Sequence, residues 1–90
     1  MIPLYARALY SAIKAYGPIP FDQAASICAC IANSKLNTMQ ADLRMHTSSA
    51  IEVHYLSLTT DKRITISKEM PDIVGDEHLP WDKYFKGVRR

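Results

Sequence analysis

The sequence lacks the patterns that define most enzymes. Only three glycines occur among its 90 residues, and they do not form the Gly-rich loop that cradles a nucleotide phosphate. No Ser, Cys or Lys nucleophile stands at a recognisable spacing from a base. We therefore expect no catalytic site and no cofactor.

Cysteine is also scarce, since Cys28 and Cys30 are the only two. Side chains two positions apart in a helix diverge by about 200° around the axis, so these thiols are poorly placed to form a disulfide. Structural zinc needs four ligands, usually from two separated pairs, and the three histidines at 46, 54 and 78 are scattered. The sequence predicts small, buried, reduced thiols and no metal site.

Long apolar runs are absent as well. No stretch reaches the roughly 18 residues that a membrane-spanning helix needs. The N-terminus does not combine a charged start with an apolar block of about 7 to 15 residues, the pattern of a secretory signal. We expect a cytoplasmic protein that does not bind a membrane. Its net charge of +2 is too small for binding nucleic acid by charge alone, so any role of charge depends on its placement.

The first half of the chain shows helical periodicity. Residues 3–16 repeat apolar side chains at helical spacing, and Gly17 followed by proline ends this helix. Residues 19–21 are too short to be more than an extended connector. A second helix over residues 22–32 carries mostly small side chains, and Asp22 is placed to cap it.

A third helix is predicted over residues 35–46, after a break at Asn33-Ser34. Its apolar stripe consists of Leu36, Met39 and Leu43, which share one side of the helix. The opposite, weakly basic face presents Ser34, Thr38, Ala41 and Met45. The stripe predicts which side packs, and the opposite face is left for a partner.

From residue 51 the period changes from helical to two. Alternation over residues 51–58 and again over 63–67 predicts two strands joined by a short polar turn, with Lys62 and Arg63 near the tip. Beyond residue 68 the chain is rich in Pro, Gly and acidic residues. Trp81, Tyr84 and Phe85 then fall at i, i+3 and i+4, so one helical turn would gather three aromatic rings. They either fold back to enlarge the core or carry the tail into a groove on a partner.

The order of these elements resembles a winged helix-turn-helix domain. The resemblance is carried by Tyr16-Gly17-Pro18-Ile19, Phe21-Asp22-Gln23-Ala24-Ala25, the Asn33-Ser34 turn, the Leu36, Met39 and Leu43 spacing, and the two strands. It covers roughly residues 3–68. It implies an α+β fold in which three helices precede a β-hairpin wing, with a domain at 1–68 and a C-terminal tail at 69–90.

The resemblance also implies a function: a small DNA-binding transcriptional regulator, of a kind common in phages and mobile elements, that binds duplex DNA as a homodimer. Residues 35–46 would be the recognition helix in the major groove, and the turn at 59–63 would be the wing. The residues implied for DNA contact are Lys35, Asn37, Thr38, Gln40, Arg44, Lys62 and Arg63.

Other interpretations remain open. The weak charge of the candidate reading face and the exposed Met45 favour a module that keeps the fold but holds or inhibits another protein. In that case Trp81, Tyr84 and Phe85 would form the partner or dimer interface, because aromatic side chains dominate interface energies. The polar residues of the third helix and the wing could also be no more than solvated surface.

Overall fold

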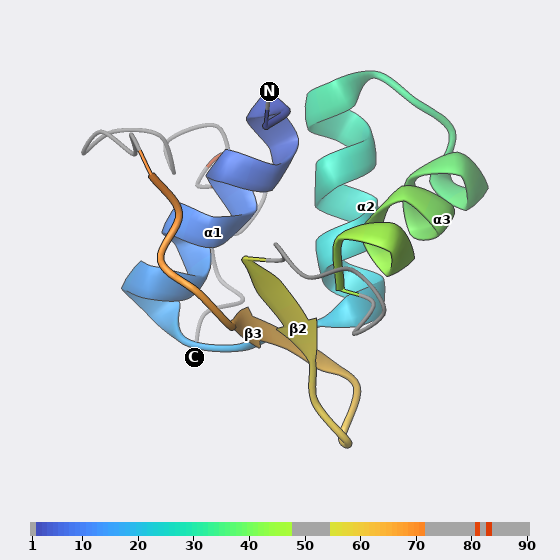
Figure 1. Ribbon diagram of the computed structural model, residues 1–90. Helices are drawn as coiled ribbons and strands as arrows, with labels where there is room; N and C mark the ends of the chain where they lie inside the picture. The colour runs from blue at the N-terminus through green and yellow to red at the C-terminus, as the bar shows by residue number, and fades with distance from the viewer. Residues whose placement is uncertain (1, 48–54, 72–80, 82, 84–90) are drawn as a thin grey trace.

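The computed structural model describes residues 2–47, 55–71, 81 and 83. Within these residues the protein is a small α+β domain of three helices and a three-stranded antiparallel sheet (Figure 1). The elements are α1 (Leu4–Tyr16), β1 (Ile19–Pro20), α2 (Phe21–Ala32), α3 (Leu36–Thr47), β2 (Leu56–Leu58) and β3 (Arg63–Ile66). The α+β class predicted from the sequence is confirmed. No helix in this part of the chain is long and apolar enough to cross a membrane.

The first two helices end at residues with positive φ. Gly17 closes α1 with φ 94° and ψ −177°, and its N–H donates to the carbonyl of Ile13 at 2.7 Å. Asn33 closes α2 in the left-handed conformation, and the next N–H, that of Ser34, donates to the carbonyl of Ala29 at 3.0 Å. Gly and Asn are the residues that adopt such conformations most readily, so both stops were predictable.

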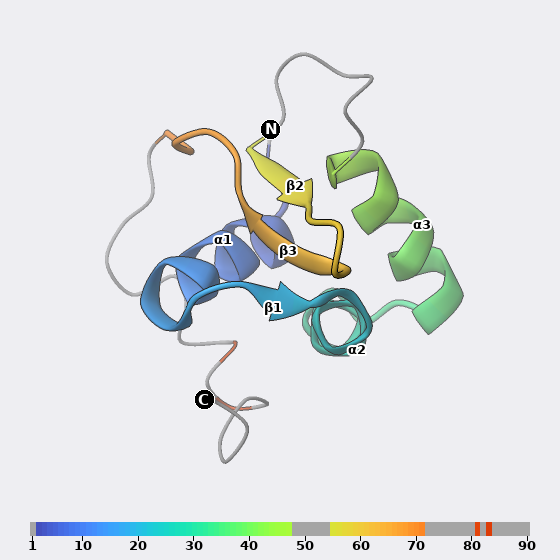
Figure 2. The same ribbon diagram turned by 90° about the horizontal axis from the view of Figure 1, so that it is seen from below.

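The segment expected to be a connector is instead a short strand. Ile19 pairs with Ile64 and Pro20 pairs with Arg63, both antiparallel. Pro20 lacks an N–H, and a strand at the edge of a sheet tolerates this because one of its sides needs no partner. The sheet order is β1-β3-β2, so β3 lies in the centre (Figure 2).

The start of α2 also differs from the prediction. Asp22 does not cap the helix: α2 begins one residue earlier, with Pro20 at the N-cap position and no side-chain capping bond. The N–H of Phe21 donates to the carbonyl of Lys62 at 3.0 Å, so the backbone of the hairpin satisfies a donor that a cap would otherwise take. Asp22 lies in the first turn, where its negative charge is favourable near the positive end of the helix dipole.

Strands β2 and β3 form the predicted hairpin, which we call the wing together with its turn at residues 59–62. Leu56 is opposite Ile66, and Leu58 is opposite Ile64. In the turn, the N–H of Lys62 donates to the carbonyl of Thr59 at 3.0 Å, and Lys62 adopts a positive φ of 64°. Residues 51–54, where the first strand was predicted to start, lie outside the described residues.

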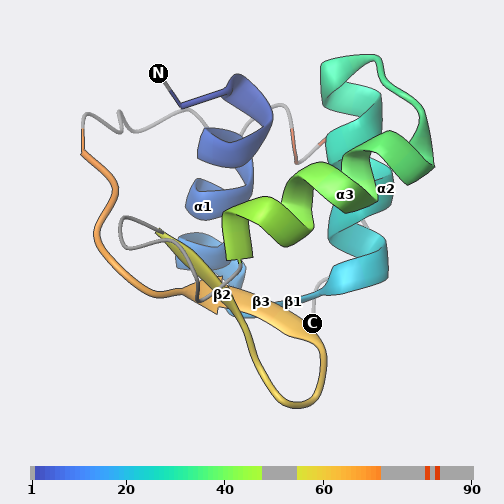
Figure 3. The ribbon, with the colours of Figure 1, turned by 45° about the vertical axis from the view of Figure 1, so that its right-hand side comes forward.

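The core lies between the helices and the sheet. Helix α3 crosses α2 and lies beside β2 (Figure 3). It buries Met39 and Leu43, as the apolar stripe predicted. Leu36, the third member of the stripe, is 46% exposed because it is the first residue of α3. The sequence pattern was therefore right for the middle of this helix and wrong for its end.

The C-terminal segment contributes to this same core. Trp81 has no exposed surface, and Met70 is 4% exposed; both belong to the buried cluster that contains Leu9 and Ile13 of α1. Trp81 is therefore a core residue and not part of an exposed partner surface, which favours the folding-back interpretation. Tyr84 and Phe85 lie outside the described residues.

Candidate nucleic-acid interface

Helix α3 presents one free face. Its inner side is held by Met39, Leu43 and Thr47, and the Thr47 hydroxyl donates to the carbonyl of Leu43 at 2.9 Å. Thr38, Ala41 and Met45 are exposed on the outer side. Because inner and outer residues alternate at the helical period, this outer face runs along most of the helix. No described segment covers it.

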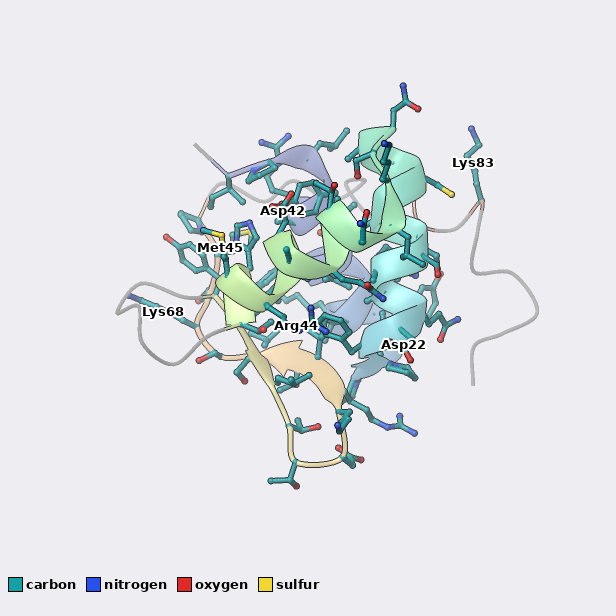
Figure 4. The ribbon with its side chains drawn as sticks, turned by 90° about the vertical axis from the view of Figure 1, so that its right-hand side faces the viewer. Asp22, Asp42, Arg44, Met45, Lys68 and Lys83 are labelled. Carbon is teal, nitrogen blue, oxygen red and sulfur yellow. The ribbon has the colours of Figure 1, made fainter. Side chains whose placement is uncertain are left out.

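The two flanks of α3 differ in charge. Arg44 lies on the flank that faces the start of α2 and the wing, and Asp42 lies on the opposite flank (Figure 4). Helical spacing places Asn37 on the same flank as Arg44. The flank that faces the wing therefore carries a positive charge and an amide, whereas Asp42 places a negative charge on the opposite flank.

A half-open groove of about 450 Å³ lies between this flank, the first turn of α2 and the wing. We refer to it below as the groove. Its lining consists of Pro20, Phe21, Asp22, Arg44, Leu58, Asp61 and Lys62. The structure thus brings together two of the predicted DNA contacts, Arg44 and Lys62, from elements that are far apart in the sequence.

Arg44 is held on one wall of the groove by an aromatic ring. Its guanidinium carbon lies 5.3 Å from the centre of the Phe21 ring, which is the geometry of a cation–π interaction. Phe21 is 8% exposed and packs in the core, so the ring is a fixed support. A guanidinium has five N–H donors, and a cation–π contact with a ring takes up none of them as a conventional hydrogen bond. Arg44 therefore keeps donors for a ligand.

The wing supplies a second cation but also an anion. Lys62 is exposed, and its carbonyl accepts the N–H of Phe21. Arg63 forms an ion pair with Asp61, which also accepts a hydrogen bond from the hydroxyl of Thr59. The groove is lined by two carboxylates, Asp22 and Asp61, as well as by two cations, Arg44 and Lys62. Its formal net charge is therefore zero, and positive charge is found only close to the two cations.

The remaining predicted contacts lie toward the other end of α3. Lys35 directly precedes the helix, and Asn37 and Thr38 are exposed in its first turn. Gln40 is partly buried. A rise of about 1.5 Å per residue separates Lys35 from Arg44 by roughly 13 Å along the axis. These four residues therefore lie nearer the N-terminal end of α3 than Arg44 does, and none of them lines the groove.

Two residues that contact the predicted cations, Phe21 and Asp61, were not named as site residues by the sequence analysis. Phe21 was noted only as part of the family resemblance, and nothing local predicts that its ring meets Arg44, since the two lie on different helices. Asp61 had a signal: it directly precedes Lys62 and Arg63 in a tight turn, where a carboxylate is close enough to pair with either of them.

A second group of polar side chains joins α1, α2 and α3 away from the groove. The Tyr5 ring packs edge-on against His46, with centres 5.8 Å apart. Burial, together with Asp42 and Cys28, raises the pKa of Tyr5 to about 12. Burial alone raises the pKa of Cys28 to about 12. Both groups are neutral at pH 7, so this cluster acts as packing.

The thiols and the acidic residues show no metal-binding arrangement among the described residues. Cys28 and Cys30 are both free; Cys28 is buried, but Cys30 is exposed, so the expectation that both would be buried is wrong for Cys30. No three His, Cys, Asp or Glu side chains within the described ranges lie together in a way that could hold a metal ion.

Comparisons with protein families, with curated proteins and with solved structures find no match to this chain. The function proposed below therefore follows from the placement of α3, the groove and the wing.

Proposed function

We propose that this chain is a small DNA-binding transcriptional regulator with a winged helix-turn-helix fold. Helix α3 enters the major groove, and the wing lies along the adjacent backbone. The observation that carries this proposal is the placement of Arg44 and Lys62: two cations from α3 and the wing line one groove beside the free face of α3. A duplex that accepts α3 presents its phosphates on both sides of that helix.

The residues divide by role. Asn37, Thr38 and Gln40 carry amides and a hydroxyl that can reach base edges, and base contacts provide sequence specificity. Arg44, Lys62 and Arg63 contact phosphates, which position the protein and supply most of the salt-dependent affinity. Lys35 adds one more cation at the start of α3.

We also propose that two copies bind one operator. In helix-turn-helix dimers the recognition helices meet half-sites about 34 to 36 Å apart, one turn of the duplex. We further propose that the chain acts in the cytoplasm as a phage or mobile-element repressor or activator. The mass of the complex with a palindromic duplex gives the stoichiometry.

The test compares two double variants by fluorescence anisotropy with a labelled duplex. Arg44→Ala with Lys62→Ala removes the two cations of the groove. Lys14→Ala with Lys83→Ala is the matched control, because it lowers the net charge equally at two exposed lysines; Lys14 lies on α1, and Lys83 lies beyond α2 in Figure 4. Both pairs are measured over a range of salt concentrations.

We expect the groove variant to lose tenfold or more in affinity and to reduce the slope of log K against log salt by up to about 1.8, since each phosphate contact contributes about 0.9. The control should retain its slope. Equal losses in both variants would mean that the binding is non-specific, and unchanged binding in the groove variant would show that the DNA-binding face is elsewhere.

The alternative is a protein-interaction module or inhibitor with the same fold. It is favoured by exposed apolar side chains, Met45 at 62% and Leu58 at 43%, and by the two carboxylates in the groove. Met45→Ser separates the two functions, because it removes apolar contact without changing charge. Two results together would establish the alternative. The native chain would form a stoichiometric protein complex and show no duplex affinity at low salt, and Met45→Ser would lose that complex.

A further inference from the structure

Phe21 contacts both residues that carry the cations of the groove, the guanidinium of Arg44 and the backbone of Lys62. Its ring lies 5.3 Å from the guanidinium carbon of Arg44 on α3. Its backbone N–H donates to the carbonyl of Lys62 in the wing at 3.0 Å. One residue at the start of α2 therefore joins the end of α3 to the tip of the hairpin.

Phe21 is suited to this role because it cannot move freely. It is 8% exposed, and its ring belongs to the buried cluster. The preceding residue, Pro20, pairs with Arg63 in the sheet, so the backbone on the N-terminal side is fixed as well. A long exposed Arg loses rotamer freedom when it binds a ligand. Stacking on a ring that is already fixed reduces that loss.

We propose that Phe21 is a positioning residue, which holds Arg44 and Lys62 at a set spacing so that they bind the DNA backbone as a pair. This inference depends on the proposed DNA-binding function. The ring fixes the guanidinium of Arg44, and the hydrogen bond fixes the backbone that carries Lys62. DNA affinity then depends on an aromatic side chain that need not touch DNA.

The binding test uses the full chain and compares Phe21→Leu with Phe21→Tyr. Leucine keeps the site apolar but removes the π face, and tyrosine keeps the face. We expect Phe21→Leu to weaken duplex binding about two- to fivefold, the range of an exposed cation–π contact. Phe21→Tyr should bind like the native chain. Thermal melting identifies the temperatures at which each variant is folded.

The same substitution is repeated in an Arg44→Ala chain, where we expect no further loss. An equal loss with and without Arg44 would show that Phe21 acts through folding alone and would overturn the proposal. The matched control is Tyr10→Leu, which removes the ring beneath Lys14, 5.9 Å from its centre, at a site on α1 that does not line the groove. This control should bind DNA normally.

A measurement on the free protein separates this inference from the proposed function. In the native chain, ring current from Phe21 should shift the Arg44 side-chain protons upfield in the NMR spectrum, and Phe21→Leu should abolish the shift. Random-coil values in the native chain would overturn the positioning role whatever the DNA result. A shifted Arg44 in a chain that binds no duplex at low salt would overturn the proposed function, and with it the part of this inference that concerns DNA.

Discussion

Asp61 and Arg63 form an ion pair across the tip of the wing, with Arg63 Nε 3.5 Å from Asp61 Oδ2. Both side chains are more than half exposed, and solvent screens the interaction between them. Surface ion pairs contribute about 0 to 1 kcal/mol to stability, and this pair should lie near the lower end of that range. Its larger effect is on charge. A phosphate that approaches Arg63 must replace a carboxylate that is already there, so the wing carries its own competitor for DNA.

We therefore predict that Asp61→Asn strengthens duplex binding. The amide oxygen can still accept the Thr59 hydroxyl, so the turn is preserved, and stability should change by less than about 0.5 kcal/mol. Freed for phosphate contact, Arg63 should steepen the salt dependence by up to about 0.9. Glu69→Gln, which makes the same charge change at an exposed site outside the groove, is the control. A comparable gain in both variants would mean that only net charge matters.

The second prediction concerns the C-terminal segment. Trp81→Ala should lower the free energy of unfolding by about 3 to 5 kcal/mol, because it removes a large side chain that has no exposed surface. Urea denaturation followed by circular dichroism measures this, since Trp81 is the only tryptophan and fluorescence is lost with it. Lys83→Ala, at an exposed position two residues on, should be neutral. A stable Trp81→Ala chain would show that the core is complete without this segment.

The third prediction tests the end of α1. A methyl group added at Gly17 would meet nothing within 4 Å, so no clash opposes Gly17→Ala. The φ of 94° with ψ −177° is nevertheless a conformation that side chains rarely adopt. We expect a loss of about 1 to 3 kcal/mol from backbone strain alone. Asn33→Gly, also at a positive φ, should cost little or nothing. Chemical denaturation of the two variants side by side would contradict this account if Gly17→Ala were neutral.

The fourth prediction concerns alkaline pH. In the folded chain the pKa of Cys28 and that of Tyr5 are both raised to about 12, from ordinary values of 9 and 10, mainly by burial. Between pH 9 and 12 the unfolded chain therefore releases protons that the folded chain keeps. The stability that these two groups contribute should be fully present below about pH 9 and should be lost as the pH rises through this window. Urea denaturation at pH 8 and pH 10.5 measures the loss, and Cys28→Ala should make it smaller. A pH-independent midpoint in the native chain would contradict the prediction.

The helices were predictable because their signals are local. Periodicity marked the buried sides, and Gly17 and Asn33 marked two of the ends. Strand β1 was predictable only as an extended segment, since two residues have no period and the pairing of Ile19 with Ile64 depends on a distant part of the chain. The start of α2 was misjudged for the same reason: the group that satisfies the N–H of Phe21 is the carbonyl of Lys62, which lies far away in the sequence.

The candidate site was also predictable only in part. Arg44 and Lys62 were named from residue type and position, because cations on a third helix and at a hairpin tip suit phosphate contact. Their shared groove, and the ring between them, depend on how α2, α3 and the wing pack together. Trp81 could be read from the sequence as either core or interface, and only its place among the buried side chains distinguishes the two.

The central position of β3 bears on the order of assembly. Ile19 finds its backbone partner in Ile64, which is synthesised after all three helices. Helical turns need only near neighbours and form early, whereas pairing between distant segments is slow because a long loop must close first. We therefore expect the sheet to form last, and a nascent chain halted before Arg63 would hold α1, α2 and α3 without β3.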